Sequence, residues 1–191
     1  MELKIKALSP KIGTDIPLPR FATAGAAGMG LYACIDQPVT LAAGERRLIP
    51  TGIAIALPSA DYVALVFARS GLGIKQGVCL SNGVGVIDSD YRGEIGVGLV
   101  NLGGEAYTIQ PADRIAQLMV TPVVQPTVVP ADTLDETDRG TGGFGSTGRG
   151  AGWGGSYRPP APRGGRSFCS GSASVTSPSA CPRWRSGIPT D

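Results

Sequence analysis

The chain has 191 residues, of which 42% are hydrophobic, 6% aromatic and 17% charged. This length fits one domain with a tail, and the 29 glycines and 16 prolines argue against a helical bundle and for short strands and turns. No apolar run reaches the roughly 20 residues that span a bilayer, and the N-terminal stretch lacks the apolar segment of a signal peptide. We therefore expect a soluble, cytoplasmic protein without a membrane partner.

The net charge of +2 is distributed unevenly along the chain. Residues 1–148 hold 11 basic and 14 acidic side chains, a net charge of −3. Residues 149–191 hold six arginines and one aspartate, a net charge of +5. The body therefore lacks the basic surface of a specific nucleic-acid-binding protein, whereas the tail has the charge for weak contact with polyanions.

The chain has four cysteines and no histidine. No two cysteines form a CxxC pair, and no histidine is present to complete a zinc site. The lack of histidine also excludes Ser-His-Asp and Cys-His mechanisms, so any general base has to be a carboxylate. Cys34 and Cys79 lie in apolar contexts, and we expect both to be buried, reduced thiols.

Short apolar segments separated by turn signals run through the first 120 residues. Strict alternation of apolar and polar residues predicts a first strand over residues 3–8. Further strands are expected at residues 31–35, 47–57 (a strand pair or one bent strand), 61–67 and 114–120. Turns are expected at residues 40–46 and 107–113, and residues 69–77 have room for a single helical turn. Closely spaced short strands of this kind predict an all-β barrel or jelly roll.

Residues 82–93, NGVGVIDSDYRG, combine glycines, β-branched residues, two aspartates, a tyrosine and an arginine. The glycines and the Asp-Ser-Asp sequence are typical of a hairpin turn, and residues 84–87 have strand character. Residues 94–101 alternate as a half-buried return strand does. We expect a hairpin that places Asp88 and Tyr91 beside a glycine-opened pocket for a flat ligand. Taken alone, the segment also fits an ordinary hairpin whose aspartates solvate a turn.

The character of the sequence changes after residue 120. Prolines at positions 122, 126 and 130 predict an extended arm outside the sheet, which ends in a glycine-rich run. Beyond residue 148, Gly, Pro and Ser dominate, and too little apolar surface remains for a core. We expect a β-barrel domain at 1–120, an extended arm at 121–148 and a disordered tail at 149–191. An altered reading frame or cloning is the alternative origin of that tail.

Four segments carry residues suited to chemistry: RSGLG at 69–73, the segment at 82–93, DRIAQ at 113–117 and RGTGGFGSTG at 139–148. Glycine-rich segments with Ser, Thr and Arg bind phosphate because bare N–H groups approach the oxygens closely. The last segment lacks the lysine of a P-loop and follows no strand-to-helix unit, so we reject a Walker-type site. Each segment also has an ordinary interpretation as a loop, a charged strand edge or a flexible terminus.

Taken together with AGAAGMGLYA at residues 24–33, these segments stand in an order that resembles the trimeric dUTPase (deoxyuridine 5'-triphosphate nucleotidohydrolase) family. The resemblance covers residues 1–148 and is closest to the bacterial branch. Its five motifs, which also number the segments, are the first at 24–33, the second at 68–73, the third at 82–93, the fourth at 113–120 and the fifth at 139–148. It implies an all-β, jelly-roll-like (β-clip) barrel subunit with an extended C-terminal arm. It further implies a homotrimer with shared active sites at the subunit interfaces.

The resemblance implies hydrolysis of dUTP to dUMP and pyrophosphate, which keeps uracil out of DNA and supplies dUMP for thymidylate synthesis. Asp88 matches the carboxylate that orients and deprotonates the water attacking the α-phosphorus. The Asn82 side chain and main-chain groups of the third motif match the uracil-binding groups. A wrong base leaves buried polar groups unpaired, and this can lower kcat/KM by a factor of about 10⁴–10⁵. Tyr91 matches the tyrosine that packs against deoxyribose and rejects a 2′-hydroxyl.

The remaining motifs match the family's phosphate-binding and closing segments. Gln117 matches the phosphate contact of the fourth motif, and Phe144 matches the aromatic ring that stacks on uracil when the arm closes. Mg²⁺ is implied as the cofactor, bound through the substrate phosphates and without direct protein ligands. The substrate-binding residues that the resemblance implies are Arg69, Ser70, Gly71, Asn82, Val86, Ile87, Tyr91, Gln117, Arg139, Phe144, Gly145, Ser146 and Thr147.

The sequence departs from the family pattern at two positions. Gly30 stands where the first motif usually has an aspartate, and Ala68 stands where proline is usual. Because the aspartate helps to organise water and metal, we expect reduced activity and weaker dependence on Mg²⁺. The alternative is a catalytically weakened or regulatory nucleotide-binding trimer. A dCTP deaminase shares the fold but fits less well, because it needs a differently placed glutamate where this chain reads VIDSDY.

Overall fold

The computed structural model describes residues 1–143, which fall into two units. Met1–Ala131 forms the body, and the second unit begins at Asp132. The expectations for the tail and for Phe144, Gly145, Ser146 and Thr147 lie outside the described residues. No helix within residues 1–143 is long and apolar enough to cross a membrane.

The body is built almost entirely from β-strands, as the sequence predicts. The elements are β1 (Lys4–Ala7), β2 (Met29–Tyr32), β3 (Val39–Leu41), β4 (Arg46–Pro50), β5 (Ile53–Ala56), β6 (Tyr62–Phe67), α1 (Ser70–Gln76), β7 (Val78–Leu80), β8 (Gly85–Ile87), β9 (Gly96–Asn101), β10 (Tyr107–Ile109) and β11 (Arg114–Pro122). Residues 47–57 contribute two strands rather than one bent strand, and the expected helical turn is a seven-residue helix.

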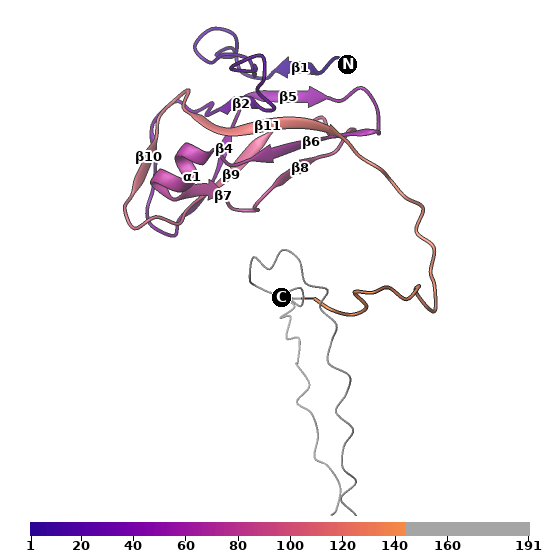
Figure 1. Cartoon of the computed structure of the whole chain (residues 1–191). Coiled ribbons are helices and arrows are strands. Elements are labelled where there is room, and N and C mark those ends of the chain that lie inside the picture. The colour runs from indigo at the N-terminus through magenta and orange to yellow at the C-terminus, as the bar shows by residue number, and fades with distance from the viewer. Residues whose placement is uncertain (144–191) are drawn as a thin grey trace, which may run out of the picture. The chain divides into compact units, whose positions relative to one another are not determined.

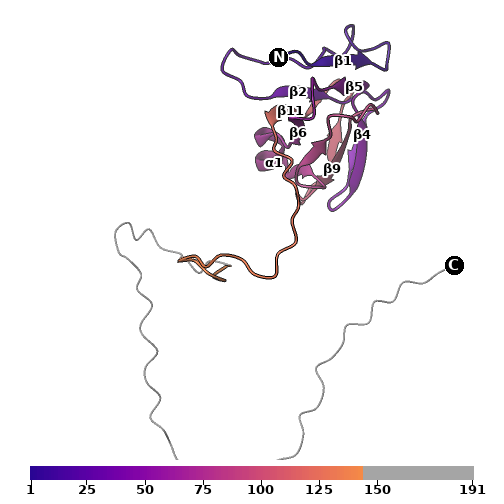
Figure 2. The ribbon, with the colours of Figure 1, turned by 90° about the vertical axis from the view of Figure 1, so that its right-hand side faces the viewer.

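The strands pair with partners that are mostly distant in the sequence. A four-stranded sheet has the order β2-β11-β6-β8, and a three-stranded sheet has the order β4-β9-β7. Two further strand pairs are β1-β5 and β10-β3, and every pairing is antiparallel. Figures 1 and 2 show how the chain crosses repeatedly between these sheets. This crossing encloses one core, as in a jelly roll.

The core consists of aliphatic side chains from the inner faces of the two larger sheets. Along β9, Val97 and Leu99 point inward and are each 1% exposed, whereas Gly96 and Gly98 alternate with them on the outer face. Leu31 of β2 and Leu118 of β11 are fully buried in the opposite sheet. Burial of each such side chain stabilises the fold by about 1.5–3 kcal/mol. The low aromatic content therefore still allows a continuous core.

The hairpin expected from residues 82–101 does not form. β8 pairs with β6, whereas β9 pairs with β4 and β7, so the two strands lie in different sheets. Ser81 marks the divergence, because its N–H donates to the carbonyl of Gly98 before the chain crosses to the other sheet. Ser89 and Asp90 lie in a turn, as the sequence predicts, but distant partners provide the strand pairing. The third segment is therefore a crossover loop between two sheets.

Two short strands lie where the sequence predicts turns. β3 and β10 each have three residues and pair with each other, with Thr40 opposite Thr108 and their hydroxyls 2.9 Å apart. Such short segments show too little alternation to be distinguished from loops. β11 extends to Pro122, two residues beyond the expected end. This proline is tolerated because β2 pairs with β11 only as far as Leu118, which leaves the last residues at an edge.

A tight turn before β11 contains a strained backbone position. Ala112 is the one non-glycine residue within 1–143 that has a positive φ, at 63°. It follows Pro111 in a turn closed by the Asp113 N–H, which donates to the Gln110 carbonyl at 3.1 Å. Turns of this type usually carry glycine at that position. Ala112 therefore holds a conformation that costs an alanine about 1–2 kcal/mol.

Relief of this strain predicts a stabilised variant. Ala112→Gly is expected to raise the free energy of unfolding by about 0.5–1 kcal/mol, after allowance for the greater entropy of glycine in the unfolded chain. Urea or thermal unfolding measures the change. Ala60→Gly, at an exposed turn position without positive φ, is the matched control and is expected to destabilise the body. Equal destabilisation by both substitutions would contradict the strain at position 112.

Candidate active site

Three of the segments singled out in the sequence line one cavity of about 350 Å³. Its lining residues are Ala22, Ala26, Ala27, Gly28, Gly30, Arg69, Ser70, Arg114 and Gln117. They come from residues 22–30, from Arg69 and the first residue of α1, and from the first half of β11. The structure therefore brings together Arg69, Ser70 and Gln117, which the sequence assigned to phosphate binding. This volume lies within the range of small-molecule sites.

Strand register fixes Gln117 at this cavity. Gln117 lies opposite Gly30 on one side and Phe67 on the other, so all three residues share one face of the four-stranded sheet. Its side-chain Nε2 donates to the carbonyl of Ala68 at 3.0 Å, which ties β11 to the loop before α1. This contact uses the backbone oxygen of Ala68, so it does not depend on the side chain at this position.

The electrostatic character of the cavity comes from Arg69 and Arg114. Arg69 Nη1 donates to the backbone oxygen of Arg114 at 2.5 Å. Burial, followed by the positive charge of Arg114, lowers the pKa of the Arg69 guanidinium from its ordinary value. Both side chains remain cationic at neutral pH, because arginine does not lose its proton there. No carboxylate is among the residues that line this cavity, so it is suited to an anion.

The third segment presents Asn82 and Asp88 to solvent at either end of β8. Asn82 stands in a turn in which Gly83 has a φ of 74°, and the Val84 N–H donates to the Asn82 carbonyl at 2.9 Å. Gly85 permits close packing, since a Cβ there would lie 3.1 Å from Val66 Cβ. Val86 and Ile87 form the rest of β8. Asn82 and Asp88 of the same chain do not line the cavity that contains Arg69 and Arg114, which we call the arginine cavity.

Tyr91 opens onto a second cavity of about 440 Å³, which is lined by Leu48, Pro50, Tyr91, Glu94 and Gly96. The Tyr91 hydroxyl donates to the Glu94 carbonyl at 3.0 Å, and its ring lies against Gly93, where any Cβ would clash with it. In the single chain, therefore, the residues matched to sugar binding and those matched to phosphate binding line different cavities.

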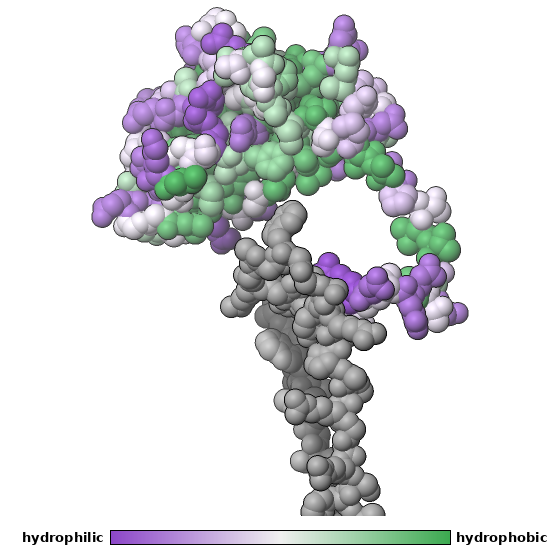
Figure 3. Space-filling model, viewed as in Figure 1, coloured by the Kyte–Doolittle hydropathy of each residue, from purple (hydrophilic) through white to green (hydrophobic). Residues whose placement is uncertain are grey.

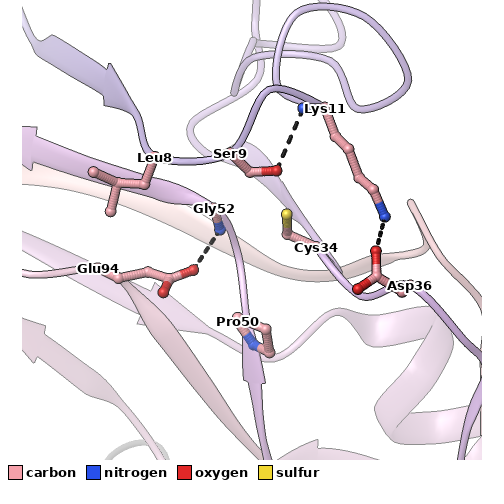
Figure 4. A pocket seen from close by; sticks show the side chains of 8 residues that line it. All are labelled: Leu8, Ser9, Lys11, Cys34, Asp36, Pro50, Gly52 and Glu94. Carbon is pink, nitrogen blue, oxygen red and sulfur yellow. Dashed lines mark hydrogen bonds and ion pairs between the residues drawn. The ribbon is translucent and has the colours of Figure 1, made fainter.

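Sequence reasoning assigned no role to Glu94, which anchors the loop that carries Tyr91. Figure 4 shows its carboxylate directed at Gly52, whose N–H donates to Glu94 Oε1 at 2.7 Å. The next residue, Ile95, accepts a 2.6 Å hydrogen bond from the buried Thr51 hydroxyl. These contacts fix the end of the crossover loop against the segment between β4 and β5. No sequence pattern indicated them, because they join parts of the chain more than 40 residues apart.

Figure 4 also shows the surroundings of Cys34, in a cavity of about 250 Å³ where Lys11 and Asp36 form an ion pair. Cys34 and Cys79 are free thiols, as the sequence predicts, but both are half-buried rather than buried. Both lie on strands or loops near the surface of the body, where apolar neighbours in the sequence do not ensure burial. Within residues 1–143 no three His, Cys, Asp or Glu side chains gather as a metal site.

The second unit positions Arg139 in a turn. Arg139 Nε donates to the carbonyl of Gly142 at 2.9 Å, and the Thr137 hydroxyl accepts the Gly140 N–H at 3.1 Å. Gly140 has a φ of 51°, which an L-residue with a side chain rarely adopts. The glycine-rich run therefore begins as an ordered turn that presents an arginine.

Known proteins share both the sequence and the fold of this chain. A family model described as dUTPase matches residues 14–148. The deoxyuridine 5'-triphosphate nucleotidohydrolase of Idiomarina loihiensis is 51% identical over 148 residues, covering 78% of this chain and 98% of the relative. The enzyme of the same name from Escherichia coli is 47% identical over the same length, with the same coverage. The chain therefore belongs to the dUTPase family.

Solved structures show the same fold. The dUTPase of Staphylococcus bacteriophage 80alpha, solved with dUPNHPP, has a TM-score of 0.68 and 25% sequence identity. The match covers 78% of this chain and 99% of the phage protein. A dUTPase from the S. aureus phage phi11 has a TM-score of 0.61 and 23% identity, covering 71% of this chain and all of the phage protein. That phage protein, a mutant form of the enzyme, coordinates a structural Mg(II) ion.

Proposed function

We propose that this protein hydrolyses dUTP to dUMP and pyrophosphate in the cytoplasm, thereby keeping uracil out of DNA. The observation that carries the proposal is the cavity formed by the first, second and fourth segments, which sets Arg69, Ser70 and Gln117 around a space suited to phosphates. Membership of the dUTPase family supplies the nucleotide that fits it. The same cavity would accept the phosphates of other nucleotides, so the base must be recognised elsewhere.

The base is proposed to bind the third segment, through the Asn82 side chain and the main chain of β8. Peptide groups are accessible there because Gly83 and Gly85 carry no side chains. Donors and acceptors in fixed positions match uracil, whereas cytosine presents the reverse pattern and thymine adds a methyl group. Such matching gives large ratios of kcat/KM between the correct nucleotide and its competitors, because a wrong base leaves polar groups unpaired. Tyr91 is proposed to pack against the deoxyribose.

Asp88 is proposed as the general base. Its carboxylate is exposed at the end of β8, and the absence of histidine leaves carboxylates as the available bases near the third segment. Asp88 takes a proton from a bound water, whose oxygen attacks the α-phosphorus. The bond from the α-phosphorus to the bridging oxygen breaks, and pyrophosphate leaves with the electron pair. Arg69 and Gln117 hold the phosphates while charge redistributes over their oxygens.

We also propose a homotrimer with shared active sites. Register places Val63, Leu65, Val86 and Met119 on the outer face of the four-stranded sheet, which Gln117 shares. Figure 3 shows hydrophobic residues gathered where β6 and β8 lie, and Val86 is 61% exposed. An exposed apolar face of this kind is suited to a second copy of the chain. Its position beside the cavity would let Asp88 of one subunit complete the site of another.

Mg²⁺ is proposed as the cofactor, carried on the substrate phosphates. Arg69, Ser70 and Gln117 line the cavity with donors that suit phosphate oxygens, so the metal would be carried by the substrate rather than by these side chains. When bound, the metal would supply positive charge to the phosphate oxygens. Arg69, Ser70 and Gln117 would hold the phosphate oxygens that the metal leaves free.

Pyrophosphate release from dUTP, dCTP, dTTP and UTP, each with and without Mg²⁺, tests the proposed function. Release from dUTP at rates far above those of the other three nucleotides is expected. The second candidate function is nucleotide binding without turnover, which Gly30 favours because it removes the usual carboxylate of the first motif. Tight binding of dUTP without pyrophosphate release would support that candidate and overturn hydrolysis. Ammonia release from dCTP would instead indicate a deaminase.

Tyr91→Phe is expected to weaken discrimination against the ribonucleotide. The substitution keeps the ring but removes the hydrogen bond to the Glu94 carbonyl, which is worth about 0.5–1.5 kcal/mol. The ratio of kcat/KM for dUTP to that for UTP is expected to fall by up to about tenfold. Tyr62→Phe is the matched control, since its ring lies on β6 away from this loop. An unchanged ratio in Tyr91→Phe would contradict the role of the hydroxyl in orienting the ring.

A further inference from the structure

Gly30 and Arg114 lie on neighbouring strands and compete for the same space. A Cβ on Gly30 would lie 2.5 Å from Arg114 Cδ and 3.1 Å from Arg114 Cγ. The stem of Arg114 therefore crosses directly over Gly30. The pairing of β11 with β2 shifts register between Arg114 and Ala116, and such an irregularity redirects the side chain beside it. Figure 1 shows β2 and β11 adjacent along this part of the sheet.

The guanidinium of Arg114 has no acidic partner among the described residues. The ion pairs found there are Lys11–Asp36 and Arg47–Glu45, neither of which involves the cavity. Asp113 is adjacent in sequence, but its carboxylate accepts the Gln110 N–H at 2.7 Å. Arg69 and Arg114 thus place two positive charges around one cavity of about 350 Å³. Two like charges around one cavity repel each other, and a bound anion removes that cost.

We propose that Arg114 binds the triphosphate of dUTP beside Arg69, and that Gly30 is the residue that lets it do so. The inference rests on the proposed function and adds a substrate-binding residue to it. A guanidinium binds phosphate oxygens with two parallel N–H donors. A carboxylate at position 30 would have no such donors. An aspartate there would displace the stem of Arg114 and neutralise its charge. Triphosphate binding therefore depends less on Mg²⁺ than it would with that aspartate.

The first test compares Arg114→Gln with the full-length wild-type chain. Calorimetry measures the Kd of the non-hydrolysable α,β-imido analogue of dUTP, with and without Mg²⁺, and the Kd of deoxyuridine. Arg114→Gln is expected to raise the Kd of the analogue at least tenfold, with the larger effect in the absence of Mg²⁺, and to leave the Kd of deoxyuridine unchanged. Arg114→Lys keeps the charge without the two-donor geometry, so an intermediate Kd is expected.

The second test addresses the link between Gly30 and Arg114. Gly30→Ala is expected to raise the Kd of the analogue by displacing the Arg114 stem, and Gly30→Ala combined with Arg114→Gln is expected to bind no more weakly than Arg114→Gln alone. Gly104→Ala is the matched control, because a Cβ there meets open space. Additive effects in the double variant would overturn the role assigned to Gly30.

Different results would overturn phosphate binding by Arg114 and dUTP hydrolysis by the wild-type protein. If wild-type protein hydrolyses dUTP but Arg114→Gln binds the analogue with wild-type affinity, the role of Arg114 is overturned and the proposed function stands. If wild-type protein neither binds the analogue nor hydrolyses dUTP, the proposed function fails, and the inference fails with it. A rise in the Kd of deoxyuridine equal to that of the analogue would indicate a general disturbance and would also overturn phosphate binding by Arg114.

Discussion

Asp88→Asn is expected to lower the kcat for dUTP by about 10²–10⁴, the range that general-base catalysis contributes in enzymes. Asparagine has the shape of aspartate but accepts no proton from water at neutral pH. The Asp88 side chain is exposed directly after β8, so the fold is expected to be unaffected by the substitution. The Kd of a non-hydrolysable dUTP analogue is expected to stay near the wild-type value. Pyrophosphate release under saturating dUTP measures the loss.

Asp90→Asn is the matched control for this prediction. Asp90 lies two residues further along the same loop and is equally exposed. Its substitution removes the same charge from the same surface, and we expect it to retain most of the activity. Loss of turnover in Asp90→Asn together with retention in Asp88→Asn would contradict the assignment of the base and transfer the role to Asp90.

Truncation of the chain after residue 138 is expected to lower kcat/KM for dUTP by at least about 100-fold. This truncation removes the turn that presents Arg139 together with Phe144, the aromatic residue proposed to stack on uracil. Base–aromatic stacking is worth about 1–3 kcal/mol and a hydrogen bond to a charged group about 1.5–3 kcal/mol. Their combined loss of about 2.5–6 kcal/mol spans the roughly 2.8 kcal/mol that a 100-fold change requires. The body, Met1–Ala131, remains intact.

Truncation after residue 148 is the matched control, because it removes the basic tail and keeps the complete fifth motif. Activity close to that of the full chain, or above it, is expected from this variant. Thermal unfolding of both truncated chains checks that the body is equally stable in each. If the chain that ends at residue 138 were as active as the one that ends at 148, the proposed closure of the arm over the nucleotide would be wrong.

The strands with clear alternation were predictable from the sequence alone. Residues 61–67 and 114–120 correspond closely to β6 and β11, because one face of each strand is buried and the other is not. Pairing was not predictable in the same way. The segment at 82–101 has the composition of a hairpin, yet its two strands join different sheets, since their hydrogen-bonding partners lie elsewhere in the chain.

In the candidate site, too, the residues of local motifs were predictable, whereas a contact between residues distant in the sequence was not. Arg69, Ser70 and Gln117 were recognisable by motif, and the structure places them around one cavity. The crossing of Arg114 over Gly30 was not recognisable, because it depends on the irregular register between β2 and β11. From the sequence, Gly30 indicates only that a carboxylate is missing. The structure shows that the side chain of Arg114 lies where a side chain on residue 30 would be.

Hydrolysis of dUTP in water enriched in ¹⁸O tests the central claim most directly. Attack of water on the α-phosphorus places the label in dUMP, and mass spectrometry of both products locates it. We predict one ¹⁸O atom in each dUMP formed and none in pyrophosphate. Label in pyrophosphate would show attack at the β-phosphorus and contradict the proposed mechanism, and the absence of both products would contradict dUTP hydrolysis itself.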